Sequence, residues 1–380
     1  MSLTSIPESV RYQLWGRAAG RCEYEGCNRR LWLDDITQCE FNAAYIAHIV
    51  ADQPRGPRGD PELSEKLAKD ISNLMLMCDF HHRLIDKVDE AGHPVARLIA
   101  MKTLHEERID MLTDIAPEKK SLVLLFDANI GPHRPMLSFE EAARGMLPDR
   151  YPADRHPIVV GFRNSTFEDC DEAYWQLHVA QMRKIIDQQL LPRTQSGGDI
   201  KHLSVFAIAP QPLLVQLGAL IGHINFAEVY QRHKEPLSWQ WELEPADFAY
   251  TVVEPSSVSR GDAALVFALS APIEDERVTA VVGDMPIWKV TLPDPNLDFL
   301  RSRAQTAAFR HTMRTLLDRI KALHGEGATI HVFPAMPVSL AVDLGRVLDP
   351  KTSLPLIIYD QNRKTGGFRK ALEVRAEVAS

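Results

Sequence analysis

Apolar and polar residues are distributed in two different ways along this chain. In the first part, apolar residues at helical spacing predict a helix from about Val10 to Gly20, after a capping sequence at residues 5–8. Two short apolar runs and one amphipathic stretch predict two strands and a closing helix, at residues 43–50, 71–77 and 95–112. Loops rich in Pro and Gly separate these elements. We therefore expect a small domain of short elements over residues 1–114.

Beyond a polar, proline-containing segment the pattern changes. Strands that are apolar throughout alternate with long amphipathic helices, first at residues 122–126, 158–162, 171–190 and 203–209. Uniformly apolar strands fit a parallel sheet that is covered on both faces. The alternation indicates an α/β fold. The sequence thus predicts an α+β domain at 1–114, a linker at 115–121 and an α/β domain at 122–380.

The second domain contains a weak internal repeat. A strand that ends in Pro210 is followed eight residues later by Gly218, and a strand that ends near Pro337 is followed at the same spacing by Gly345. Long helices at residues 171–190 and 298–323 extend the correspondence. We interpret residues 122–255 and 256–380 as two related α/β units. The alternative is a chance match, because strand, turn and helix often follow one another.

Composition narrows the class of protein. The chain is 45% hydrophobic and 25% charged, which is typical of globular proteins. No apolar run approaches the roughly 18 residues of a membrane span, and the N-terminus lacks the pattern of a signal peptide. We expect a soluble, cytoplasmic protein with no membrane partner. A net charge of −8 argues against a protein that coats nucleic acid through bulk charge.

Cysteine and histidine spacing predicts a metal site near the N-terminus. Cys22 and Cys27 lie on a turn-rich stretch, and Cys78 and His81 follow about fifty residues later. Two such pairs supply the four ligands of a closed tetrahedral zinc site. An odd number of cysteines in a reducing compartment also makes a disulfide framework improbable. Structural zinc would hold together a domain that is too small for a large core.

Three further residues, interleaved with these ligands, carry a family resemblance. The order His48, Asn73, His82 around two zinc knuckles resembles the HNH endonucleases, whose core is the ββα-metal fold. His81 stands where that family usually has a second cysteine. The resemblance implies that His48 is the general base that activates water, that Asn73 orients the His48 loop, and that His82 binds a divalent ion.

The second protein ligand of that ion is open. Ala47 precedes His48, where many HNH enzymes carry a metal ligand, and Asp86 or Asp52 would have to replace it. The ion is Mg²⁺ or another hard divalent cation. Acidic residues outnumber basic ones in residues 1–114, so DNA contact needs a local cluster. Arg55 and Arg58, between His48 and Asn73, are the candidates for contacts to phosphate; the alternative is a solvated loop.

Residues 122–380 contain no phosphate-binding glycine loop and no nucleophile elbow. Open α/β sheets bind ligands beyond the carboxyl ends of their strands, and helix N-termini there favour phosphate. Candidate ligand-binding residues lie at the two strand-to-helix turns and after the last predicted strand: Gln211, Met336, Pro337, Tyr359, Arg363 and Lys364. The alternative is that they are ordinary loop residues.

A zinc-knuckle HNH module ahead of a duplicated α/β domain resembles the HNH–SAVED effectors of bacterial CBASS (cyclic-oligonucleotide-based antiphage signalling) systems, whose SAVED domains are fusions of two CARF-like units. The resemblance implies an antiphage endonuclease that stays inactive until its SAVED domain binds a cyclic dinucleotide, or alternatively a cyclic trinucleotide, from a partner cyclase. It also implies that binding promotes a homo-oligomer, from dimer to tetramer, which degrades double-stranded DNA.

Two other functions fit the sequence. The first is a modification-dependent HNH restriction endonuclease, in which residues 122–380 would recognise modified DNA. The absence of a dense Lys/Arg stripe there counts against it. The second is a non-enzymatic zinc-knuckle binding module with a regulatory ligand domain.

Overall fold

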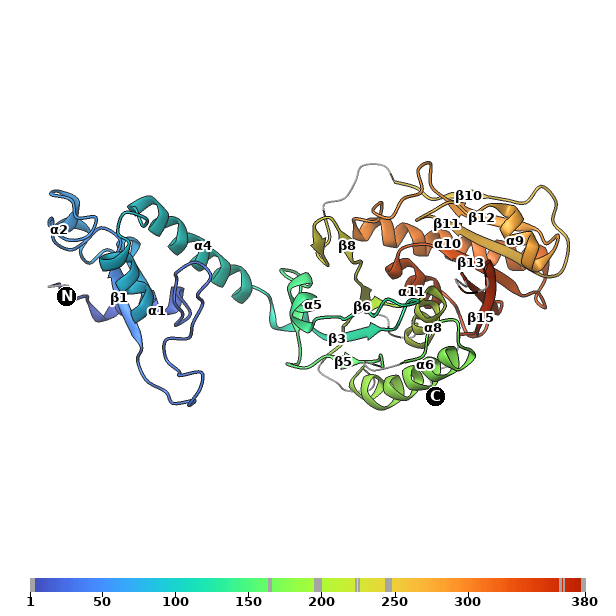
Figure 1. The fold of residues 1–380 in the computed structure, drawn as a ribbon, viewed down its shortest axis with the longest axis horizontal. Helices are drawn as coiled ribbons and strands as arrows, with labels where there is room; N and C mark the ends of the chain where they lie inside the picture. Colours follow the sequence, from blue (N-terminus) through green and yellow to red (C-terminus); the bar gives the residue numbers. More distant parts are fainter. Residues whose placement is uncertain are drawn as a thin grey trace. The chain divides into compact units, whose positions relative to one another are not determined.

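The computed structural model describes residues 4–162, 166–194, 200–222, 224, 226–242, 248–361, 364 and 366–376. The chain forms two compact units, Met1–Ala116 and Pro117–Ser380 (Figure 1). Their division falls inside the expected linker at 115–121. Lys120 and Ser121 already belong to a strand of the second unit, so the connection is shorter than the sequence predicts.

Unit 1 is built around a two-stranded antiparallel sheet and a short helix. Strands β1 and β2 pair from Ala44 with Cys78 to His48 with Leu74, and helix α3 follows β2 directly. Every residue of β2 is buried, which explains its unbroken apolar sequence. The elements of unit 1 are α1 (Glu8–Arg17), β1 (Ala44–His48), α2 (Leu63–Leu67), η1 (Ile71–Asn73), β2 (Leu74–Cys78), α3 (Asp79–Arg83), the π-helical turn η2 (Leu84–Val88) and α4 (Val95–Thr113).

Two expectations about unit 1 are wrong in detail. Pro7 occupies the N-cap position of α1 and no side chain caps the helix, so the predicted capping box at residues 5–8 does not form. The apolar run at 71–77 is also not one strand. Its first three residues form the single turn η1, because Asp70 accepts a hydrogen bond from the backbone N–H of Ser72.

Within its described residues, unit 2 contains two large sheets, each with a parallel centre, and a small antiparallel pair of strands, β8 and β9. The first has the order β4-β3-β6-β7, with β5 also on β3, and the second has the order β10-β12-β11-β13-β14-β15. The elements of the first half are η3 (Pro117–Lys119), β3 (Lys120–Asp127), α5 (Phe139–Gly145), β4 (Tyr151–Pro152), β5 (Ile158–Val159), α6 (Glu172–Ile185), η4 (Ile186–Leu190), α7 (Leu191–Thr194), β6 (Leu203–Ile208), α8 (Gln211–Ile221), β7 (Ala227–Val229), β8 (His233–Lys234) and β9 (Leu237–Ser238).

The second half repeats this pattern of strand and helix. β11 pairs in parallel with β13 as β3 pairs with β6, and α11 follows β13 as α8 follows β6. Its elements are β10 (Thr251–Val253), β11 (Ala263–Ala268), α9 (Asp275–Val282), β12 (Ile287–Thr291), α10 (Arg303–His324), β13 (Ile330–Ala335), α11 (Val338–Arg346), β14 (Leu356–Gln361) and β15 (Phe368–Val374). β10 already belongs to the second sheet, so the strands of that sheet begin a few residues before the approximate division at 255/256.

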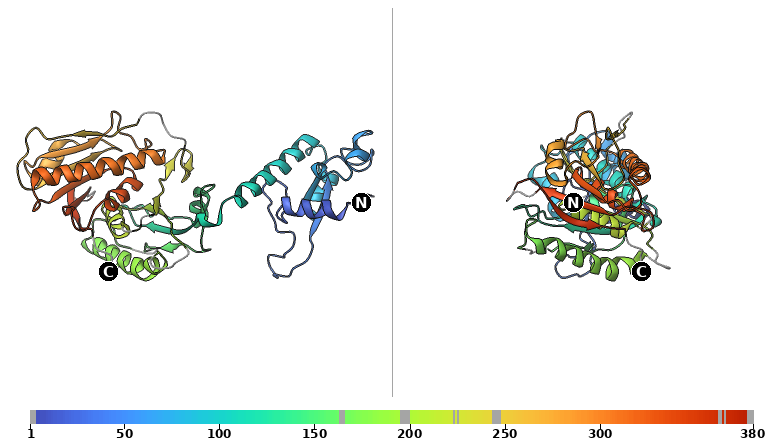
Figure 2. Two further views of the ribbon diagram at one scale, coloured as in Figure 1. Left: turned by 180° about the vertical axis from the view of Figure 1, so that it is seen from behind. Right: turned by 90° about the vertical axis from the view of Figure 1, so that its right-hand side faces the viewer.

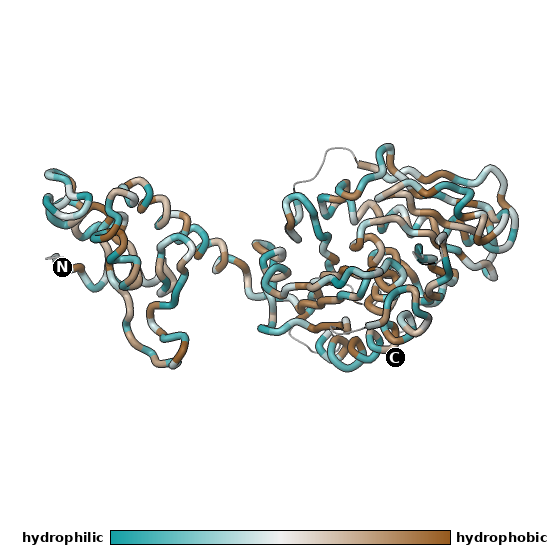
Figure 3. The backbone as a smooth tube through the Cα atoms, viewed as in Figure 1, coloured by the Kyte–Doolittle hydropathy of each residue, from teal (hydrophilic) through white to brown (hydrophobic). Residues whose placement is uncertain are grey.

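One hydrophobic core joins the two halves of unit 2. It contains residues of both parallel centres, such as Leu124 and Val332, together with α8 and α11, which lie side by side in Figure 1. The long helix α10 covers the second sheet with Phe309 and Met313 (Figure 2). Hydrophobic residues follow the strands, as Figure 3 shows. Among the described residues, no helix has the length and apolar character needed to cross a membrane.

Candidate functional site

The four predicted zinc ligands lie together. One ligand atom from each of Cys22, Cys27, Cys78 and His81 falls within 4.8 Å of the other three. Nδ1 of His81 lies 3.2 Å from Sγ of Cys78 and 3.7 Å from Sγ of Cys22. Ligands of a tetrahedral zinc ion lie about 3.6–3.8 Å from one another, given zinc bonds of about 2.1 Å to nitrogen and 2.3 Å to sulfur. The donor set and its spacing therefore fit zinc.

The surroundings of the cluster suit a bound cation. Burial raises the pKa of the Cys22 thiol, so a thiolate at this position needs a nearby cation to stabilise it. The backbone N–H of Cys78 donates to Sγ of Cys22 over 3.4 Å, which adds to that stabilisation. Burial, and then the neighbouring His93, lower the pKa of His81 and favour the neutral ring that ligation requires.

A second layer of contacts holds His81 in place. Its ring stacks on Tyr24 with centroids 4.0 Å apart and planes 5° apart. The Tyr24 hydroxyl in turn lies 3.0 Å from Nε2 of the buried His93. Neither residue is among those predicted from the sequence, although Tyr24 stands between Cys22 and Cys27, where a residue that faces the cluster is to be expected.

His48 ends β1 and is almost fully buried. Its Nε2 lies 3.0 Å from the carbonyl oxygen of Ala68. A carbonyl only accepts hydrogen bonds, so Nε2 carries the proton and Nδ1 of the neutral ring keeps its lone pair. The arrangement can therefore accept a proton at Nδ1, which is what a general base must do.

Asn73 binds the segment that follows His48. Its side-chain oxygen accepts from the backbone N–H of Val50 over 2.8 Å, and its side-chain nitrogen donates to the Val50 carbonyl over 2.8 Å. The Asn73 carbonyl also accepts from the N–H of Ile49. Three hydrogen bonds thus fix the two residues after His48, and this is the geometry that an orienting role requires.

His82 lies on α3, directly after His81, which is one of the four candidate zinc ligands. Its Nε2 is 3.3 Å from Oδ2 of Asp86, and its ring stacks on Tyr45 with centroids 5.2 Å apart. Burial lowers the pKa of His82, while Asp86 and Asp79 act against that shift. An imidazole and a carboxylate this close can share one divalent cation whose other ligands are water and phosphate.

The two arginines expected to contact DNA differ sharply. Arg55 is exposed, and within the part of the chain that the structure describes its side chain has no hydrogen bond or ion pair. The Arg58 side chain is only 6% exposed and pairs with Asp86 over 2.6 Å. Arg58 is thus not free to contact a phosphate. Asp52, the other carboxylate weighed as a metal ligand, accepts from the backbone N–H of Thr4.

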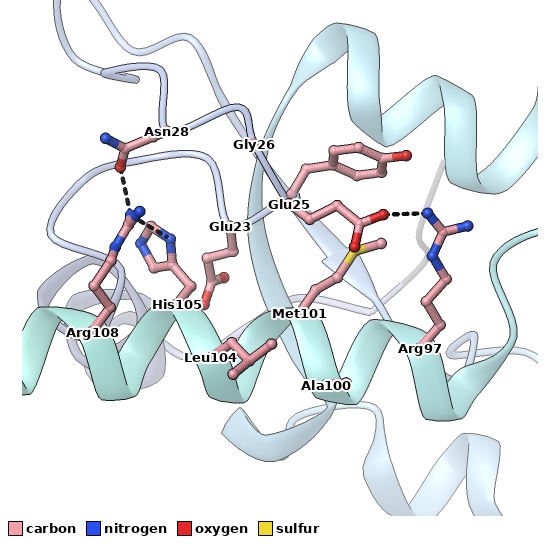
Figure 4. Close-up of a pocket in the computed structure, with 11 residues that line it drawn as sticks. Glu23, Glu25, Gly26, Asn28, Arg97, Ala100, Met101, Leu104, His105 and Arg108 are labelled. Carbon is pink, nitrogen blue, oxygen red and sulfur yellow. Dashed lines mark hydrogen bonds and ion pairs between the residues drawn. The ribbon is translucent and has the colours of Figure 1, made fainter. Parts of the chain in front are cut away.

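A cavity of about 310 Å³ lies between the segment that carries Cys22 and Cys27 and helix α4 (Figure 4). Figure 4 shows Arg97 paired with Glu25 at one end and Arg108 bonded to Asn28 at the other. Both arginine side chains therefore already have partners within unit 1. We therefore regard the cavity as part of the packing between that segment and α4.

In unit 2, two of the predicted ligand-binding residues, one from each half of the unit, are joined by a hydrogen bond. Nε2 of Gln211, at the start of α8, donates to the carbonyl of Met336 over 3.0 Å, and Pro337 is the N-cap of α11. Oε1 of Gln211 is buried and has no hydrogen-bond partner within the described residues. The carboxyl ends of β6 and β13 are therefore brought together, as the ligand-site hypothesis requires.

The candidate ligand-binding residues near the last parallel strand have partners other than Gln211 and Met336. Tyr359 is buried, with its hydroxyl 2.9 Å from Nδ1 of His331 and its ring stacked on Phe333, so it belongs to the core. Lys364 pairs with Glu168 over 3.4 Å. Arg363 lies outside the described residues.

A second cavity, of about 600 Å³, was not anticipated from the sequence. It lies between the start of α6 and the paired strands β14 and β15. Its lining residues are Asp169, Cys170, Trp175, Gln176, Asp360, Gln361, Arg369, Lys370, Ala371, Leu372 and Glu373. Asp360 and Gln361 directly follow Tyr359 at a strand end, so the strand-end rule that selected Tyr359 would have found them one residue later.

Part of this chain is similar to proteins of known structure. No curated protein sequence is significantly similar to it. The Acinetobacter baumannii Cap4 SAVED/CARF-domain containing receptor, solved with the cyclic trinucleotide 2′3′3′-cAAA, is 13% identical over 74% of this chain and 60% of its own, with a TM-score of 0.44. The corresponding Moraxella osloensis receptor is 13% identical over 73% of this chain and 58% of its own, with a TM-score of 0.37. The chain thus spans about 60% of the length of these receptors.

The model of one protein family matches the chain directly. It is the SMODS-associated and fused to various effectors sensor domain, abbreviated SAVED, and it covers residues 184–374. The matched segment runs from the end of α6 through β15 and includes both α8 and α11. Because the match covers half of the sequence, this chain belongs to the SAVED family of sensor domains.

Proposed function

We propose that this protein is an antiphage effector, a metal-dependent DNA endonuclease that a cyclic oligonucleotide activates through its SAVED domain. The observation that carries the proposal is the Cys22, Cys27, Cys78 and His81 cluster. It ties β2 and α3 to the chain segment before β1. His82 lies on α3, Asn73 directly precedes β2, and His48 ends β1, the strand that pairs with β2. A sensor domain and this set of residues in one chain fit an effector whose chemistry resides in unit 1.

In the proposed reaction, Nδ1 of His48 takes the proton of the attacking water. The Ala68 carbonyl holds the ring in the required tautomer, and Asn73 holds the backbone behind it. His82 and Asp86 would hold the divalent cation, which supplies charge stabilisation at the scissile phosphate when bound. The zinc is structural in this proposal: its four protein ligands leave no position open for substrate.

The activating ligand is proposed to bind at the carboxyl ends of the parallel strands in unit 2. Gln211 and Met336 meet there, and the cavity of about 600 Å³ lies at the end of β14. That volume falls within the range of small-molecule sites. Trp175 can contribute a ring face, and Arg369 and Lys370 can contribute charge to phosphates. We favour a cyclic dinucleotide, with a cyclic trinucleotide as the alternative, and expect binding to promote oligomers.

A plasmid assay with the purified full chain tests this function. Supercoiled DNA is incubated with Mg²⁺ or Mn²⁺ and with each member of a panel of cyclic di- and trinucleotides. We expect cleavage to depend on one of these ligands. His48→Ala should abolish cleavage while zinc content and ligand binding persist, because His48 is not one of the four clustered ligands and the proposed ligand site is built from residues of unit 2.

Two outcomes of this assay would favour an alternative function. Cleavage that follows DNA methylation and ignores every nucleotide would favour the modification-dependent restriction endonuclease. Equal behaviour of the wild-type protein and His48→Ala, with tight zinc and no cleavage under any condition, would favour the non-enzymatic binding module.

A further inference from the structure

Arg58 makes an unusually complete set of contacts for an arginine in a loop. All three guanidinium nitrogens have acceptors: Nε donates to the carbonyl of Ile49 over 2.8 Å, and Nη1 donates to the carbonyl of Ile85 over 2.7 Å. Nη2 donates to the carbonyl of His48 over 3.3 Å and to Oδ1 of Asp86 over 2.6 Å. The guanidinium therefore joins the end of β1 to the π-helical turn η2 that follows α3.

The backbone of Arg58 is also held in a special conformation. Its φ is +55°, in the left-handed region that non-glycine residues seldom adopt. Its N–H donates to Oε1 of Glu90 over 2.8 Å. Such a conformation persists only where the surroundings over-determine it, and it is often found at functional sites. Side chain and backbone therefore both fix Arg58 in one place.

The contacts of Arg58 link the two histidines of the proposed nuclease site. The guanidinium binds the carbonyl of His48 directly and Oδ1 of Asp86, and Oδ2 of Asp86 lies 3.3 Å from Nε2 of His82. One charged group thus sets the strand end that carries His48 against the helix that carries His82. The planar guanidinium carries several N–H donors and can reach acceptors in these different directions. A lysine ammonium is a single point charge and cannot replace it at this position.

We propose that Arg58 is a positioning residue of the nuclease site, which fixes His48 relative to His82 and Asp86, and that it is not a DNA-contact residue. The inference rests on the proposed endonuclease function. A positioning residue acts on the rate of the bound complex, because a misplacement of about 1 Å at reacting groups costs about 10²-fold. A phosphate contact acts on DNA affinity and on its salt dependence.

The test compares Arg58→Lys with the control Arg17→Lys in the full chain. Both changes keep the charge, but only Arg58 loses a fork that serves several acceptors. Cleavage at saturating DNA is measured with the activating nucleotide, and DNA affinity is measured without divalent cation. We expect Arg58→Lys to lower the cleavage rate about 10²-fold and to leave DNA affinity within about twofold. Arg17→Lys should leave the rate nearly unchanged, because Arg17 is an exposed residue of α1 outside the proposed site. A weaker DNA affinity in Arg58→Lys, with an unchanged cleavage rate, would overturn the proposal.

A second readout does not need nuclease activity. Hydrogen–deuterium exchange of the full chain should rise in Arg58→Lys at residues 46–51 and 83–88, the two segments that the guanidinium joins. The segment with Cys22 and Cys27 should be unaffected, and zinc content should match the wild-type protein. Unchanged exchange in both segments would overturn the inference even in an active enzyme. If exchange rises as expected but the wild-type protein cleaves no DNA, the proposed function fails and the structural link stands.

Asp86→Asn, which removes the ion pair but keeps the side chain's size, should raise exchange at residues 83–88 alone.

Discussion

At the scale of single residues, His81 shows how one side chain can join a metal site to its surroundings. Its Nδ1 faces Cys22 and Cys78, one face of its ring lies on Tyr24, and the edge of Phe80 contacts it. A cysteine at this position would supply an equivalent ligand atom at a similar reach, but it would lose the stacking contact. The ligand role of His81 and its packing role can therefore be separated by substitution.

We predict that His81→Cys retains one zinc per chain, whereas His81→Ala loses it. A thiolate can complete the tetrahedral set, but alanine leaves three ligands. Since loss of a residue that only supports a ligand already costs 10- to 100-fold in affinity, His81→Ala should lower zinc affinity by about 10²-fold or more. Metal analysis and competition with a chromogenic chelator measure this. Wild-type zinc affinity in His81→Ala would exclude the ring from the ligand set.

How far single residues could be predicted depends on where their partners lie. Cys22 and Cys27, like Cys78 and His81, form local pairs, so their spacing alone predicts a cluster. The partners of Arg58 are backbone carbonyls and a carboxylate up to 28 positions away, and no sequence pattern marks them. The sequence therefore shows that Arg58 is near His48 but not that it is buried. The prediction that Tyr359 binds the ligand has a related weakness, because a position at a strand end does not show on which face of the sheet the ring lies.

At the scale of elements, the two halves of unit 2 meet where α8 crosses α11. A Cβ on Gly218 would lie 1.9 Å from the carbonyl oxygen of Val342, and a Cβ on Gly345 would lie 2.0 Å from the carbonyl oxygen of Val215. Both contacts are with backbone, which cannot move aside as a flexible side chain can. The internal repeat pointed to these two glycines as equivalent positions. That they touch each other could not be predicted, because the repeat shows correspondence and not contact.

We predict that Gly218→Ala destabilises unit 2 by about 2–3 kcal/mol and weakens binding of the activating nucleotide, because the helices must separate to admit the methyl group. Gly222→Ala, at the C-cap of α8 about one turn beyond Gly218, is the matched control: its Cβ would meet nothing closer than 3.5 Å. Chemical unfolding of each variant, followed through the tryptophans of unit 2, measures the difference. Equal stability of the two variants would contradict the close crossing.

At the scale of the whole molecule, the proposed nuclease activity would endanger the cell's own DNA, so the proposal requires a low basal rate. A ligand can raise that rate only by binding the competent state more tightly than the resting state. Unit 1 is acidic and offers few free cations near His48, so one copy should hold a duplex weakly. Joining copies through unit 2 would raise the local concentration of nuclease sites on one duplex without any new DNA contact.

We predict that inactive subunits interfere with active ones in a mixed assembly. Wild-type protein is mixed with a ninefold excess of His48→Ala, activating nucleotide is added, and plasmid products are separated as nicked and linear forms. If assembly is random, about one wild-type subunit in ten then pairs with another wild-type subunit. We therefore expect nicked circles to replace linear DNA, since a mixed pair can cut only one strand. The control adds the same excess of an unrelated protein, which should leave linear DNA as the main product. Linear product that persists at the wild-type rate in the presence of the dead subunits would mean that each chain cuts alone, and activation would then have to act within unit 1 and unit 2 of a single copy.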